Sequence, residues 1–221
     1  MGFVDTFLNY DVIMRTLPML WRGVGNTLAL AGVTLTVGAV LGVLVCLIRL
    51  YAPLPFRILA IAFVDLFRAI PILVLLVLIH FALPFAGVVF SAFTSATVAL
   101  TLVFAAFTAE VFRAGIQAIP KGQIEAAQAL GLPFPVIIWK IILPQAWRIA
   151  LPPHTSNSVA IAKDTSLASV VAMPDLLKQA TDAQALTANP SPLVAAALMY
   201  LIVLLPAVRL VSYLERRYRP L

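Results

Sequence analysis

Residues 23–48 read GVGNTLALAGVTLTVGAVLGVLVCLI, and no charged residue occurs between Arg22 and Arg49. An α-helix rises about 1.5 Å per residue, so a run of this length is long enough to cross a hydrocarbon core of about 30 Å. The run therefore predicts a membrane-spanning helix, and the other long apolar runs of the chain are interpreted in the same way.

The composition of the whole chain agrees with this interpretation. Of its 221 residues, 62% are hydrophobic and 11% are charged, whereas soluble domains average about 45–50% and about 25%. The net charge of +6 is explained by basic residues beside membrane spans, without nucleic-acid binding. A single cysteine, Cys46, rules out an intramolecular disulfide. We expect an all-α membrane protein in contact with lipid.

The apolar runs predict about five transmembrane helices. Residues 69–109 are uncharged and long enough for two crossings, with a break near Leu83-Pro84. Residues 149–162 are too few for one crossing, so the fourth span is expected to continue through Lys163 and Asp164. We therefore predict a single domain over residues 1–221, with spans at about residues 23–48, 56–83, 91–116, 149–172 and 183–208.

The basic residues orient these spans. Five crossings place the termini on opposite sides, and Lys and Arg favour cytoplasmic loops. An external amino terminus and a cytoplasmic carboxyl terminus leave three basic residues outside and ten inside. Those outside are Arg15, Arg22 and Lys178; those inside are Arg49, Arg57, Arg113, Lys121, Lys140, Arg148, Arg209, Arg216, Arg217 and Arg219.

Only one long polar segment interrupts the apolar sequence. Residues 122–131 of this segment read GQIEAAQALG. Its small and apolar residues recur at i, i+3 and i+7 and share one helix face, while Glu125 lies on another. Gly131 supplies a carboxyl-terminal stop. The pattern predicts a cytoplasmic helix at about residues 121–132, serving either as a docking element or as a cover over the cytoplasmic mouth of the bundle.

This segment resembles the E-A-A-x-x-x-G motif of permease subunits in ATP-binding-cassette (ABC) importers. Five segments in order are similar to the polar amino-acid permease family of histidine, glutamine and glutamate transporters, and they cover most of the chain from Gly25 to the fifth span. They are FRAIP (67–71), AEVFRAGIQ (109–117), KGQ (121–123), LPQA (143–146) and KDTSL (163–167). Ile70-Pro71 and the tail SYLERR (212–217) look more like the glutamate and aspartate branch.

The resemblance implies the transmembrane domain of a type I ABC importer, in a bacterial cytoplasmic (inner) membrane, forming the path for a polar amino acid. It implies a second permease chain, identical or homologous, and an extracytoplasmic solute-binding protein. No G-x-x-x-x-G-K-[ST] phosphate loop occurs, so ATP and Mg are expected on a separate, dimeric ATPase subunit, and this chain is expected to bind no cofactor and to be no enzyme. The residues implied to couple to that ATPase are Gly122, Glu125, Ala126, Ala127 and Gly131.

Two other classes of function are weaker alternatives. A stand-alone ion-coupled carrier is expected to contain repeated halves with broken helices, and no such duplication is visible. A membrane-embedded enzyme is disfavoured because the sequence contains neither H-E-x-x-H nor G-x-S-x-G. His80 and His154 lie among apolar residues and are expected to be hydrogen-bonded interior side chains, so no metal site is predicted.

Polar residues in the fourth span are the candidate solute contacts. Polar groups at membrane depth are expensive unless they face protein or a water-filled cavity. A stripe of them could bind the ammonium and carboxylate groups of a zwitterion, or the span could end at Lys163 with the rest as an external loop. The candidate residues are Asn157, Lys163, Asp164, Thr165 and Ser166.

Two charged pairs at i, i+3 spacing are candidate structural or gating ion pairs. Asp65 and Arg68 lie at the beginning of the second span, followed by Pro71, which predicts a kink. Glu110 and Arg113 lie near the cytoplasmic end of the third span, where we expect a structural pair at the start of the polar loop.

Overall fold

The computed structural model describes residues 2–218, and every regular element among them is a helix. Arg219, counted above among the cytoplasmic basic residues, lies outside the described residues. In chain order the elements are α1 (Phe3–Phe7), α2 (Tyr10–Tyr51), α3 (Leu54–Ala69), α4 (Ile72–Val77), η1 (Leu78–Ala82), η2 (Leu83–Ala86), α5 (Ala92–Gln117), α6 (Lys121–Ala129), α7 (Phe134–Ile137), η3 (Ile138–Ile142), α8 (Leu143–Asp164), η4 (Thr165–Val171), α9 (Leu176–Thr187) and α10 (Ser191–Arg217).

Long apolar helices dominate the described part of the chain. By length and hydropathy, four helical segments there could each cross a membrane, and α3 together with residues 72–86 brings the number to as many as five. The first segment includes α2, which is 42 residues long and contains the whole uncharged run 23–48. Asn9 caps α2 by accepting a hydrogen bond from the backbone N–H of Val12.

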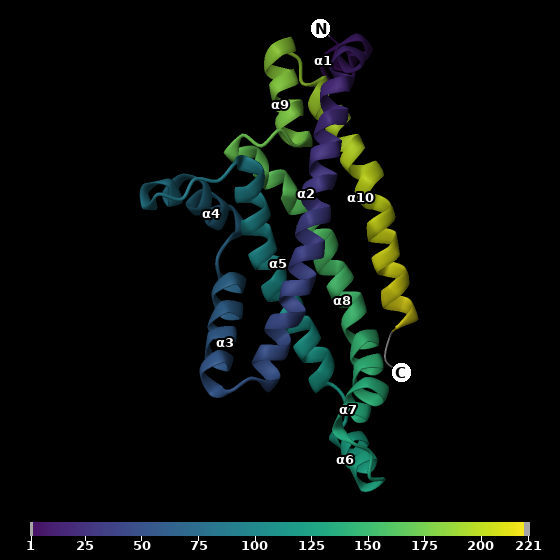
Figure 1. Ribbon diagram of the computed structural model, residues 1–221. Coiled ribbons are helices and arrows are strands. Elements are labelled where there is room, and N and C mark those ends of the chain that lie inside the picture. Colours follow the sequence, from purple (N-terminus) through teal and green to yellow (C-terminus); the bar gives the residue numbers. More distant parts are fainter. Residues whose placement is uncertain (1, 219–221) are drawn as a thin grey trace.

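The expected second span is broken rather than continuous. α3 ends at Ala69, and the helical segment Ile72–Ala86 leaves at an angle of 104°, so that it projects sideways from the bundle (Figure 1). Pro71 has no backbone N–H to continue the ladder, and Ile70 before it adopts an extended conformation with ψ of 131°. The expected span at about residues 56–83 thus consists of two helical segments, and the expected kink at Pro71 is a full break.

The fourth and fifth spans also differ from the expected ranges. Helical structure runs from Phe134 through α7, η3 and α8 to Val171, so it begins well before residue 149, and its last turns are 3₁₀ rather than α-helical. The range 183–208 is wrong because residues 183–187 belong to a separate helix, α9. Ala188 takes a left-handed conformation with φ of 48°, and α10 begins only at Ser191.

The core of the bundle forms around α5. This helix packs most extensively against α2 and then against α8, and it contributes small buried residues together with Phe104, which is fully buried. A Cβ added at Gly42 of α2 would lie 2.5 Å from Thr108 Cβ and 2.7 Å from the carbonyl oxygen of Ala105. The backbones of α2 and α5 therefore approach as closely as only glycine allows here.

The two ends of the bundle carry different elements. α1, α9 and the start of α10 gather at one end, and α6 with α7 lies at the opposite end (Figure 1). The expected helix at about residues 121–132 is thus present, although it ends three residues earlier, at Ala129.

Candidate functional site

A cavity of about 280 Å³ lies between the break after α3, helix α5 and helix α8. The break contributes to it directly, because the turn between α3 and α4 forms one wall. Its lining residues are Arg68, Ile70, Pro71, Ile72, Val103, Phe107, Asn157, Ala160, Ile161 and Asp164. The lining is mostly apolar. Its polar side chains are one guanidinium (Arg68), one carboxylate (Asp164) and one amide (Asn157).

Arg68 and Asp164 line this cavity without pairing with each other. The described residues form three ion pairs, and neither side chain belongs to any of them. The Arg68 guanidinium instead lies over the ring of Phe107, with its carbon 5.7 Å from the ring centroid, a cation–π contact. The expected pair between Asp65 and Arg68 is therefore not formed. Two opposite charges remain available to a polar guest.

The structure divides the expected polar stripe of the fourth span. Asn157 and Asp164 line the cavity, whereas the side chain of Lys163 is exposed outside it. The hydroxyls of Thr165 and Ser166 donate to the backbone carbonyls of residues 162 and 163 at 2.7 and 2.8 Å. These two residues thus stabilise the helix end, and the structure gives them no place in the cavity lining.

Sequence reasoning missed Arg68 as a member of this site. The i, i+3 spacing favoured a pair with Asp65, but the last turn of α3 packs against α5 and brings Arg68 to the cavity that α8 also lines. The available signal was Pro71 itself, since a proline inside an apolar span exposes backbone and neighbouring side chains at membrane depth.

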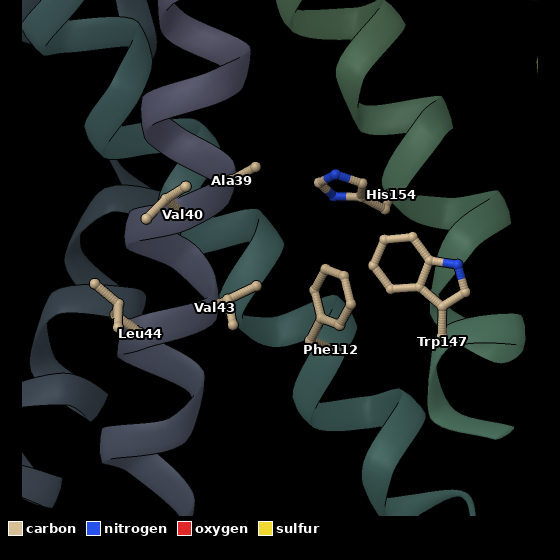
Figure 2. A pocket seen from close by; sticks show the side chains of 7 residues that line it. All are labelled: Ala39, Val40, Val43, Leu44, Phe112, Trp147 and His154. Carbon is tan, nitrogen blue, oxygen red and sulfur yellow. The ribbon is translucent and has the colours of Figure 1, made fainter. Parts of the chain in front are cut away.

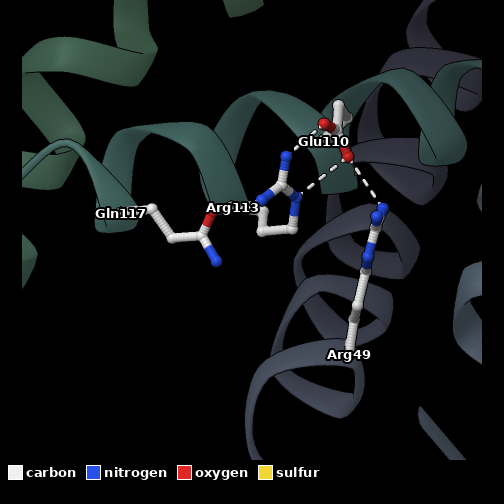
Figure 3. Close-up of polar contacts among 4 residues, drawn as sticks. All are labelled: Arg49, Glu110, Arg113 and Gln117. Atoms are coloured by element: carbon white, nitrogen blue, oxygen red, sulfur yellow. Dashed lines mark hydrogen bonds and ion pairs between the residues drawn. The ribbon is translucent and has the colours of Figure 1, made fainter.

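A second polar cluster lies at the end of α5 that leads into α6. Glu110 accepts from Arg49 Nη1 at 2.7 Å and from Arg113 Nε at 3.0 Å, and Arg113 Nη2 also bonds its other oxygen (Figure 3). Arg113 further donates to Gln117. The pair between Glu110 and Arg113 is thus present, and Arg49 joins it from α2. One carboxylate ties the ends of two helices together.

Helix α6 exposes Glu125 and buries Ala127. Ala127 is 3% exposed and packs with Ile119, Ile137, Ile142 and Ala146, residues that follow α5 or lie in α7, η3 and α8. Glu125, Ala126 and Gly122 are exposed.

The end of α6 is closed by a left-handed glycine. Gly131 has φ of 72°, its N–H bonds the carbonyl of Gln128 at 2.9 Å, and the N–H of Leu132 bonds that of Ala127 at 3.1 Å, which is a Schellman-type stop. The helix is therefore fixed on one face and free on the other.

A second cavity, of about 320 Å³, lies between α2, α5 and α8. Figure 2 shows His154, Phe112 and Trp147 facing the valines of α2 across it. The His154 ring stacks on Phe104 and tilts against Phe112, both at 5.4 Å between centroids. Because no charged side chain lines this cavity, it offers nothing to pair with a charged solute.

The histidines show no metal-binding arrangement. Within residues 2–218, no three His, Cys, Asp or Glu side chains are grouped as a metal ion requires. His80 Nδ1 lies 3.0 Å from the hydroxyl of Ser95.

Comparison with known proteins identifies related chains. Residues 35–220 match the family described as binding-protein-dependent transport system inner membrane component. The chain is 36% identical to the probable glutamine ABC transporter permease protein GlnM of Bacillus subtilis (strain 168), over 95% of this chain and 98% of that protein. It is 31% identical to the arginine transport system permease protein ArtQ of the same organism, over 96% and 98%.

A solved structure shares the fold closely. A chain in the crystal structure of an amino acid ABC transporter with histidines superposes with a TM-score of 0.86 at 32% identity, and the match covers 93% of this chain and 96% of that one. The described helices thus have the arrangement of an ABC importer's membrane domain.

Proposed function

The chain belongs to the family of binding-protein-dependent transport system inner membrane components, and we propose on this basis that it forms the membrane path for a polar amino acid in an ABC importer. The solute passes the cavity between the α3–α4 break, α5 and α8. The lining of that cavity is what supports a polar amino acid as the cargo.

The observation that carries the proposal is the pair of unmatched charges in the cavity. Arg68, which is exposed, and Asp164, which is half-buried, line one cavity, and neither forms an ion pair or hydrogen bond with another described residue. An isolated charge in a membrane span is expensive and marks a solute or ion pathway. A guanidinium and a carboxylate are the partners that an α-carboxylate and an α-ammonium group require.

Energy is supplied through α6. We place the exposed face around Glu125 against a separate, dimeric ATPase subunit that binds ATP and Mg. Ala127 anchors the opposite face of α6 on residues of α7, η3 and α8, so a displacement of α6 is passed to the helix that carries Asn157 and Asp164. The Glu110 cluster ties α5 to α2 and holds the start of this loop in place.

The remaining partners follow from the family. A second permease chain, identical or homologous, completes the path, and an extracytoplasmic solute-binding protein delivers the amino acid. The proposed orientation in the bacterial inner membrane has the amino terminus outside and α6 in the cytoplasm. The separation of α6 from the amino-terminal end of the bundle (Figure 1) agrees with this orientation.

The test is the energy source for uptake in intact cells that express the chain, compared with a matched strain lacking it. Chain-dependent uptake of labelled amino acids should stop when arsenate depletes ATP and should persist when ionophores collapse the ion gradients. Uptake that follows the ion gradients while ATP is exhausted would instead favour the stand-alone carrier.

A further inference from the structure

The cavity between α3, α5 and α8 contains one positive and one negative side chain, Arg68 and Asp164. These two charges can pair with the α-carboxylate and the α-ammonium group of an amino acid. No other charged side chain in the cavity lining then remains to pair with a charged solute side chain. We propose that the path selects amino acids whose side chain is uncharged and disfavours both acidic and basic ones. This inference rests on the proposed function and adds the charge class of the solute.

The two charges line the same cavity and come from two different helices. Arg68 extends from the last turn of α3, and its guanidinium lies against the ring of Phe107. Asp164 is the last residue of α8. A guanidinium binds a carboxylate through two parallel hydrogen bonds, while the Asp carboxylate accepts from an ammonium group. Both charges of the protein are then used by the solute backbone.

A third charge, on the solute side chain, would meet no counter-charge. Apart from the amide of Asn157, the remaining lining is aliphatic or aromatic. Lys163 acts electrostatically on Asp164 but is exposed and does not line the cavity. Glu110 is occupied by two arginines. An unpaired charge in such surroundings is strongly disfavoured. Asn157 can instead hydrogen-bond a neutral polar side chain.

The size of the cavity suits one small solute. Its volume of about 280 Å³ lies near the lower limit of about 300–1,000 Å³ for small-molecule sites. The relatives include proteins named for glutamine and for arginine, so family membership alone does not fix the charge of the cargo. The lining residues of this chain supply that information.

The experiment measures binding without the solute-binding protein, because that protein would impose its own selectivity. The permease complex, purified with its ATPase in lipid nanodiscs, is titrated with L-glutamine, asparagine, serine, methionine, glutamate, aspartate, arginine and lysine. We expect a neutral amino acid to bind most tightly and the four charged ones to bind at least about 30-fold more weakly. Binding of an acidic or basic amino acid as tight as that of the best neutral one overturns the inference.

Two substitutions should shift the charge preference in opposite directions. Asp164→Asn leaves the cavity positive, so glutamate should gain on glutamine by about tenfold or more in relative affinity. Arg68→Gln leaves it negative, so arginine should gain instead. Asp65→Asn and Arg57→Gln change charges outside the cavity lining and should leave the preference unchanged. A merely structural role for the two residues would weaken all solutes alike.

The outcomes separate this inference from the proposed function. A complex that binds glutamate best, and loses it with Arg68→Gln, contradicts the selection for neutral side chains and leaves amino-acid transport intact. A complex that binds none of the eight amino acids contradicts both.

Discussion

Glu110 is the most heavily engaged ionic residue in the described chain, because its carboxylate holds Arg49 and Arg113 together (Figure 3). All three side chains are only about one fifth exposed, at 18–22%. Removing the carboxylate leaves two guanidinium groups close together without a counter-charge. Because these side chains are partly buried, the loss in the free energy of unfolding is expected to lie between the loss for a surface ion pair and the loss for a buried one.

The substitution Glu110→Gln should therefore lower the free energy of unfolding by about 2–3 kcal/mol, measured by thermal unfolding of the purified chain in detergent. Asp182→Asn is the matched control, because it breaks an ion pair at the surface. In that pair the side chain of Lys178 is 30% exposed and that of Asp182 is 43% exposed. That control should change stability by less than about 1 kcal/mol. Equal losses from the two substitutions would contradict the structural role of Glu110.

Asp175 is a buried carboxylate at the other end of the molecule. It precedes α9, outside the long apolar helices, and its Oδ1 accepts from the backbone N–H of Lys178 at 2.8 Å. Its Oδ2 is buried without a hydrogen-bond partner among the described residues. Burial raises the pKa of Asp175 from 3.8 to about 6, although hydrogen bonds from backbone N–H groups and the nearby Lys178 charge lower it.

A raised carboxyl pKa means that the folded chain binds this proton more tightly than the unfolded chain. The contribution of Asp175 to stability is therefore greatest below pH 3.8, falls as pH rises, and is lost above about pH 6. Asp175→Asn keeps the capping oxygen but removes the titration. Between pH 4.5 and 7.5 the variant should gain up to about 2 kcal/mol relative to the unaltered chain. Parallel melting-temperature curves for the two proteins would contradict this prediction.

At the residue scale, the sequence predicted two of the three polar residues that line the candidate site. Asn157 and Asp164 were identified because polar groups at membrane depth need a reason to be there. Arg68 was predicted to pair with Asp65, and this was wrong. Spacing along one helix shows which residues could pair, but packing against other helices decides which contact forms. The orientation of α3 relative to α5 decides that Arg68 meets Phe107.

At the element scale, the contact between α2 and α5 depends on the absence of side chains. A Cβ at Gly42 would lie within 2.7 Å of three atoms of α5, including a backbone oxygen that cannot move independently. Gly32 lies in the same helix with nothing within 4 Å of its added Cβ. Substituting Ala at each glycine therefore distinguishes the effect of helix packing, present only at Gly42, from the effect of helix propensity, present at both.

Gly42→Ala should destabilise the chain by about 1–2 kcal/mol, because overpacking exceeds the gain in helix propensity. Gly32→Ala should be neutral or stabilising by up to about 1 kcal/mol. Thermal unfolding of both variants in the same detergent measures the difference. If Gly42→Ala were as stable as Gly32→Ala, the close approach of the two helices would be wrong.

Apolar run length predicted that helices exist but not where they break. The uncharged tract beginning at Ala183 continued from α9 into α10, and hydropathy alone does not register the left-handed turn at Ala188. Pro71 was visible as a breaker, yet the 104° angle depends on how residues 72–86 pack against α5. Helix breaks between apolar segments are set by local backbone and tertiary contacts together.

At the scale of the whole molecule, the candidate cavity and α6 are linked by continuous structure. Ala127 packs on residues of α7, η3 and α8, and α8 continues to Asp164 at the cavity. α5 leads into α6 from the other side, held by the Glu110 cluster. In the proposed mechanism, a displacement of α6 would reach two walls of the cavity through these packed helices.

The central claim is that this chain is driven by a separate ATPase docked on α6. The most direct measurement is affinity purification of the tagged chain from its own membranes in mild detergent, followed by mass spectrometry of the bound proteins. Glu125→Arg, on the exposed face of α6, is compared with Glu215→Arg, the same change at an exposed position of α10. We predict that an ATPase with a phosphate-loop motif is recovered with the unaltered chain and with Glu215→Arg and is lost with Glu125→Arg, while all three chains remain folded in the membrane. Recovery of the unaltered chain without an ATPase, or equal recovery of the ATPase with both variants, would contradict the account.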